Sequence, residues 1–88
     1  MIVLLSGDGK YLLKDNDIEA VLETGRNLYS FVRDNRDQDF LKALTELHGF
    51  VRTKGRPVEI FRPVDFIIPP IDCDPRIIRL SFGIQKTP

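Results

Sequence analysis

The chain has 88 residues, with thirteen Lys and Arg against thirteen Asp and Glu, so its formal net charge is zero. A chain of this length forms one domain, because single cores grow well past a hundred residues before they divide. An apolar fraction of 42% with 30% charged residues is ordinary globular composition and argues against disordered or fibrous architectures. We therefore expect a single small domain over residues 1–88.

The neutral total conceals an uneven distribution of charge. Residues 1–51 hold six basic and nine acidic side chains, whereas residues 52–62 hold four basic side chains against one Glu. The basic stretch consists of Arg52, Lys54, Arg56 and Arg62. A protein whose main task is to neutralise a phosphate backbone normally carries a clear basic excess, so neutrality argues against that task.

The cysteine count and the N-terminal sequence bear on the compartment. Cys73 is the only cysteine, so no intramolecular disulfide can form. The apolar run Met1–Leu5 is too short for the hydrophobic region of a signal peptide. No window approaches the roughly 18 apolar residues that a membrane span requires. We expect a cytoplasmic protein that does not enter the membrane.

The first elements read as a hairpin of two strands, over about residues 2–6 and 10–14. Between them stands Asp8-Gly9, a pair that favours a type I′ turn with positive φ at both central positions. The first strand lacks polar alternation, which predicts that it lies centrally in the sheet or is covered on both faces.

A first helix is predicted from the N-cap Asn16, because Glu19 then stands at N3 and completes a capping box. Gly25 falls inside the apolar stripe of this helix, where it weakens the helix by about 1 kcal/mol relative to Ala. We expect close approach by a neighbouring backbone to explain this glycine. The stripe consists of Ile18, Val21, Leu22, Leu28, Tyr29 and Val32.

A second helix begins at Asp37 or Gln38, after a polar break of about three residues. Gly55, followed by Pro57, is suited to the C′ position that ends it. So short a break predicts that the two helices pack as an antiparallel pair. The apolar face of this helix consists of Phe40, Leu41, Leu44, Leu47, His48 and Val51.

The last third of the chain returns to strand patterns. Residues 58–62 and 64–68 alternate on either side of Pro63, with Ile60 inward, and proline restricts such a segment to a sheet edge or a kink. Residues 77–84 alternate most cleanly, with the inward set Ile78, Leu80, Phe82 and Ile84. The order β-β-α-α-β-β predicts an α+β fold, with an antiparallel or mixed sheet and the helix pair on one face. The pattern does not decide which strand residues 77–84 adjoin.

The residues that could support catalysis or metal binding are few. His48 falls on the apolar face of the second helix, and we interpret it as a partly buried, hydrogen-bonded structural residue. Cys73 lies between Asp72 and Asp74, whose charges raise a thiol pKa and suppress the thiolate. A zinc site needs three or four ligands, mainly Cys and His, and the chain has one of each. We predict no catalytic set, no metal site and no cofactor.

Two features remain as functional candidates. The basic stretch can be solvated and helix-capping charge, a contact for an acidic protein, or a weak contact for nucleic-acid phosphates. The second feature is a set of apolar residues out of phase with the inward positions, which suggests an exposed interface. This set consists of Phe61, Ile67, Ile71 and Ile77.

Together these features favour a small protein-binding module, an adaptor, regulator or accessory subunit, with homodimerisation expected. Its predicted contact residues are Arg52, Lys54, Arg56, Phe61, Arg62, Ile67 and Ile71. The apolar members would supply most of the affinity, while the basic members would steer an acidic partner. The alternative is a weak nucleic-acid-binding protein that uses the same basic stretch.

Overall fold

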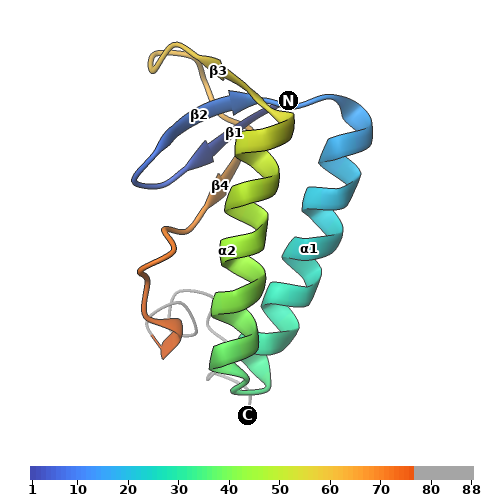
Figure 1. Cartoon of the computed structure of the whole chain (residues 1–88), viewed down its shortest axis with the longest axis vertical. Helices are drawn as coiled ribbons and strands as arrows, with labels where there is room; N and C mark the ends of the chain where they lie inside the picture. The colour runs from blue at the N-terminus through green and yellow to red at the C-terminus, as the bar shows by residue number, and fades with distance from the viewer. Residues whose placement is uncertain (77–88) are drawn as a thin grey trace.

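The strands form one mixed sheet at one end of a helix pair (Figure 1). The computed structural model describes residues 1–76, so the strand predicted over residues 77–84 lies outside the described residues. The sheet order is β3-β2-β1-β4, with β1 parallel to β4 and the other neighbours antiparallel. The strands are β1 (Ile2–Leu5), β2 (Gly9–Leu12), β3 (Arg56–Val58) and β4 (Phe66–Ile68). The predicted α+β class, element order and central position of the first strand are confirmed.

The β1–β2 connection differs from the predicted type I′ turn. Leu5 pairs with Gly9, and the Asp8 N–H donates to the Leu5 carbonyl oxygen at 2.9 Å. Gly7 has φ of +86°, as the third residue of a type II turn requires, whereas Asp8 and Gly9 do not have positive φ. The prediction for Asp8-Gly9 is therefore wrong, because the pairing register leaves a three-residue loop and moves the left-handed position to Gly7.

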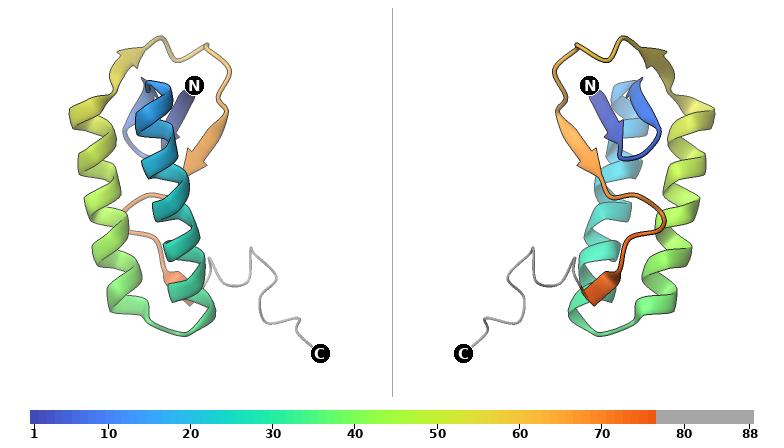
Figure 2. Two further views of the ribbon diagram at one scale, coloured as in Figure 1. Left: turned by 90° about the vertical axis from the view of Figure 1, so that its right-hand side faces the viewer. Right: turned by 90° about the vertical axis from the view of Figure 1, so that its left-hand side faces the viewer.

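Two helices, α1 (Asp15–Arg33) and α2 (Asp37–Lys54), pack as the predicted antiparallel pair on one face of the sheet (Figure 2). The predicted capping box is wrong, because α1 begins one residue before Asn16 and its N-cap is Lys14, with no side-chain cap. The chain enters the helix almost directly from the sheet, where the Leu13 N–H donates to the Met1 carbonyl oxygen at 2.9 Å. Acidic side chains in the first turn complement the positive end of the helix dipole instead.

The core lies between the helix pair and the inner face of the sheet. Val3 and Leu5 of β1 are fully buried, as are Leu44 and Val51 of α2. Alternation along β1 and helical spacing along α2 bring these side chains to the same layer. The core cluster consists of Val3, Leu5, Leu13, Ile18, Val21, Leu28, Val32, Phe40, Leu44, Leu47, Val51 and Ile68.

The connection from α2 to β3 passes tightly against β2. Gly55 is the C-cap of α2 with φ of −85°, so it is not the left-handed C′ residue that the sequence predicted. A Cβ atom at this position would lie 2.7 Å from the Val51 carbonyl oxygen and 2.9 Å from the Tyr11 Cβ. Glycine is therefore required here by close approach and not by a positive φ.

Gly25, in contrast to Gly55, has no close neighbour among the described residues at the position of an added side chain. A Cβ atom added there would meet nothing within 4 Å in the described part of the chain. The predicted close approach of a neighbouring backbone is thus absent among residues 1–76. Gly25 instead lines a groove that Phe66 and Ile68 of β4 also border.

Replacing Gly55 with Ala should lower the free energy of unfolding by about 1–3 kcal/mol, because the new methyl group overlaps backbone and Cβ atoms that cannot move independently. Gly49→Ala is the matched control, since a Cβ there meets nothing within 4 Å. This control should raise the free energy of unfolding by about 1 kcal/mol through helix propensity. Urea denaturation measures both, and equal effects of the two substitutions would contradict the packing argument.

Candidate functional site

The outer face of the sheet is not covered by a helix in the described part of the chain (Figure 2). Val3 and Leu5 point toward the helices and are fully buried, so Leu4 between them points outward. The strand registers align Leu4 with Lys10 of β2, Lys10 with Val58 of β3, and Leu4 with Ile67 of β4. One row of side chains, mostly apolar, therefore crosses all four described strands on this face.

The β3–β4 loop borders this row. The Lys10 ammonium group donates to the carbonyl oxygens of Ile60 and Arg62, the second at 2.6 Å. This anchor holds two strongly exposed apolar residues, Ile60 at 84% and Phe61 at 79%, beside the sheet. Ile67 at the other side of the row is 66% exposed. We call the following set the open face: Leu4, Lys10, Leu12, Val58, Ile60, Phe61 and Ile67.

The open face is slightly concave near the β1–β2 hairpin. A hollow of about 410 Å³ is bordered by Leu4, Lys10, Val58 and Ile60. The Lys10 ammonium group already donates to two loop carbonyl oxygens, and the other three side chains are apolar. The surface therefore offers apolar contact area more than charge.

The basic stretch does not form one continuous patch. The Arg52 guanidinium lies 2.5 Å from a carboxylate oxygen of Asp8, at the β1–β2 turn. Arg62 pairs with Glu59 at 3.8 Å. Arg56 is exposed and stands opposite Leu12, at the other end of β2. Two of the four predicted basic residues therefore have acidic partners, and a third is displaced along the sheet.

The Arg52–Asp8 pair is also electrostatically coupled to Tyr11. The hydrogen bond from Arg52 lowers the pKa of Asp8, and the hydroxyl of Tyr11, which donates to Asp8 at 3.0 Å, acts in the same direction. The hydrogen bond to Asp8 raises the pKa of Arg52. These contacts link the end of α2 to the β1–β2 turn.

His48 and Ile71 border a separate hollow of about 350 Å³ beyond that turn. His48 is 2% exposed, and its Nε2 donates to the Pro69 carbonyl oxygen at 2.7 Å, which confirms the prediction of a buried, hydrogen-bonded residue. Its Nδ1 is buried and has no hydrogen-bond partner among the described residues. Ile71 is 45% exposed and borders this hollow, so this predicted contact residue lies away from the row on the sheet.

Cys73 is half-buried near the end of the described chain. Burial raises the pKa of its thiol, and the charges of Asp72 and Asp74 act in the same direction. Over residues 1–76, no group of three His, Cys, Asp or Glu side chains could hold a metal ion. Neither described helix is both long enough and apolar enough to cross a bilayer.

Several members of the open face were missed by the sequence patterns. Ile60 was predicted to point inward on a strand over residues 58–62, but that prediction is wrong, because β3 ends at Val58 and Ile60 lies in the loop. Leu4, Leu12 and Val58 were not predicted as contact residues. The unbroken apolar run of β1 is the signal that could have found Leu4, since a strand that is apolar throughout presents apolar groups to both faces.

These observations define a small α+β domain whose sheet is packed by helices on one face and, among the described residues, carries no helix on the other, where the β3–β4 loop lies beside the strands. A family model described as PspAA, PspA-Associated protein, matches residues 1–82. The chain belongs to this family of PspA-associated proteins. No curated protein and no solved structure matches the chain.

The Arg52–Asp8 pair predicts a specific pH dependence. Because the folded state lowers the pKa of Asp8 below its ordinary value of 3.8, the pair contributes stability above about pH 5 and loses that contribution as the pH falls through and below 3.8. The difference in free energy of unfolding between the wild type and Asp8→Asn should therefore shrink toward acid. Urea denaturation from neutral pH to below pH 3 measures it. Arg52→Gln should show the same decrease toward acid in its difference from the wild type. A difference in free energy of unfolding that does not change with pH for either variant would contradict the coupling.

Proposed function

We propose that this chain is a non-catalytic accessory subunit that binds a PspA-type protein through the open face. The observation that carries the proposal is the sheet face without a helix, with a mainly apolar row across its strands that includes exposed Ile67, and with strongly exposed Ile60 and Phe61 beside it. A contiguous apolar surface of this kind is typical of a protein-binding site. The family name supplies the class of partner.

The charges near this face support a secondary role for electrostatics. Arg56 and Lys54 are exposed at the β3 end of the sheet, where they would attract an acidic surface on the partner and orient its approach. Apolar anchors at the centre of an interface usually supply most of the affinity. The proposed division is therefore apolar anchoring by Phe61 and Ile67 with steering by Arg56 and Lys54.

Other parts of the proposal are supported by residues outside the open face. His48 uses Nε2 to bond a backbone carbonyl and keeps Nδ1 buried, which favours a structural role over general-base catalysis. A single, half-buried cysteine fits a reducing cytoplasmic setting. We also propose that the open face can pair two copies of the chain when the partner is absent, and that the partner displaces the second copy.

Ile67→Ser and Phe61→Ser should each weaken binding to a purified PspA-type protein by about tenfold or more, because each removes an exposed apolar anchor. Isothermal titration calorimetry with folded variants measures the change. Leu22→Ser is the matched control, because Leu22 is a similarly apolar, 40% exposed residue on α1 and not on the sheet. Equal losses for all three variants, or no loss for Ile67→Ser and Phe61→Ser, would contradict the proposal. Ile71→Ser tests whether the contact extends past the β1–β2 turn.

The nucleic-acid alternative predicts a different response to salt. Binding to duplex DNA would weaken log-linearly with salt, with a slope of about 0.9 per phosphate neutralised, and Arg56→Ala would reduce that slope by about one unit. Binding by the open face should change only slightly between low and high salt, and Arg56→Ala should act mainly on the association rate. Fluorescence anisotropy with duplex DNA, beside titration with the PspA-type protein, separates the two functions.

A further inference from the structure

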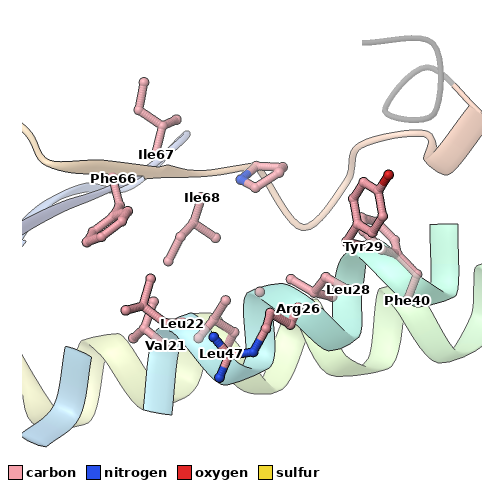
Figure 3. Close-up of a pocket in the computed structure, with 12 residues that line it drawn as sticks. Val21, Leu22, Arg26, Leu28, Tyr29, Phe40, Leu47, Phe66, Ile67 and Ile68 are labelled. Atoms are coloured by element: carbon pink, nitrogen blue, oxygen red, sulfur yellow. The ribbon is translucent and has the colours of Figure 1, made fainter. Parts of the chain in front are cut away.

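A second apolar surface lies beside β4, in a groove between this strand and α1 (Figure 3). The groove has a volume of about 380 Å³, which is within the range of small-molecule sites. Phe66 and Ile68 point from β4 toward α1, whereas Ile67 points away from the helix. Leu22 on the α1 side is 40% exposed, so part of the apolar lining is open to solvent. The groove therefore lies on the helix side of β4, opposite the open face.

Gly25 stands in the middle of α1 and lines this groove. Leu22 and Tyr29, three residues before it and four residues after it, line the groove as well, so all three share one helix face. A glycine weakens a helix interior relative to alanine. No described atom lies within 4 Å of a Cβ added here. Gly25 therefore leaves open a part of the groove that a longer side chain would fill.

Arg26 follows Gly25 directly and is the one charged residue that the structure places in this lining. Its side chain is exposed and forms no ion pair with a carboxylate of residues 1–76. Most other arginines of the described chain have such a partner, namely Arg33, Arg36, Arg52, Arg62 and Arg76. A guanidinium group binds a carboxylate through two parallel hydrogen bonds. The groove thus combines an apolar surface with one cation that suits an anionic group.

The lining favours an occupant whose body has no polar groups. Apart from Arg26 and the hydroxyl of Tyr29, the side chains that line the groove are apolar. A peptide segment would need partners for its backbone N–H and C=O groups, because burying them unpaired is unfavourable. β4 offers such partners only along its three residues, Phe66–Ile68. An alkyl chain has no such groups and gains affinity from each methylene that it buries.

We propose that the groove binds an alkyl carboxylate, such as a free fatty acid. Its chain lies between α1 and β4, over Gly25, and its carboxylate pairs with Arg26. From Val21 to Tyr29, the α1 side of the groove extends about 12 Å, because each helical residue adds about 1.5 Å. Decanoate, whose extended chain has a similar length, is the probe that the groove should accommodate. Pairing of two copies through the open face would leave the groove accessible, with one ligand for each chain.

Isothermal titration calorimetry of the full 88-residue chain with sodium decanoate, below its micelle concentration, tests the site. Decanoate should bind more tightly than butyrate by about tenfold or more, because each buried methylene strengthens binding by up to about fourfold. Decyltrimethylammonium has a similar chain and the opposite charge, and it should bind more weakly than decanoate by about fivefold or more. Absence of decanoate binding, or equal binding of the two decyl probes, would overturn the proposal.

Two glycine substitutions distinguish the groove from other apolar surfaces. Gly25→Leu should weaken decanoate binding by about tenfold or more, because the new side chain occupies the groove. Gly49→Leu is the matched control, since it adds the same side chain to α2 outside the lining, where no described atom lies within 4 Å of the new Cβ. Both substitutions favour the helix, so loss of the fold does not account for a difference between them. Decanoate binding that survives Gly25→Leu, or that both variants lose equally, overturns the proposal.

Two further variants test the headgroup contact and separate the groove from the open face. Arg26→Gln should weaken decanoate binding by about fivefold, so that the two decyl probes bind with similar affinity. Phe61→Ser should leave decanoate binding unchanged. An unchanged preference for decanoate in Arg26→Gln, or loss of decanoate binding in Phe61→Ser, would overturn the proposal. Failure of Phe61→Ser to weaken partner binding would instead remove the proposed function and leave the groove proposal unaffected.

Discussion

The pairing of β1 with β4 is the contact on which the rest of the structure depends. The two strands run parallel, and both helices lie between them in the sequence. Their pairing therefore brings the last third of the chain back beside the first strand. The Asp65 carboxylate accepts the Ile2 N–H at 2.8 Å, and the Asp65 N–H donates to the Ile2 carbonyl oxygen at 2.8 Å. These two hydrogen bonds set the register that buries Ile68 and exposes Ile67. The same register opens the groove beside α1.

A sheet with helices on one face leaves two kinds of apolar surface. The outer face has a row of side chains that no described helix covers, while the edge of the inner face leaves a groove over α1. They differ in what would fill them. The outer face is broad and is formed by all four described strands, which fits the folded partner proposed for it. The groove is narrow and lies beside the outer edge of β4, which pairs only with β1 among the described strands.

The fold shows where the balanced charges of the chain lie relative to one another. Arg52 and Arg62, which looked like members of a basic patch, are paired with Asp8 and Glu59. Lys10, from the acidic half of the sequence, is used to hold the β3–β4 loop. These cations are therefore bound by carboxylate or carbonyl oxygens of loops and turns and do not form a continuous basic patch.

The sequence by itself determined the order of elements, the helix pair, the central position of the first strand and the buried, hydrogen-bonded position of His48. Each follows from local features of the sequence: hydrophobic periodicity, residues that form turns or end helices, and the small number of reactive side chains. Tertiary structure decided the Gly7 turn, the glycine at position 55 and the outward position of Ile60. These depend on strand register and on atoms distant in sequence, such as Tyr11 beside Gly55. Length and composition limited the possible folds, and only long-range strand pairing decided which apolar side chains remain exposed.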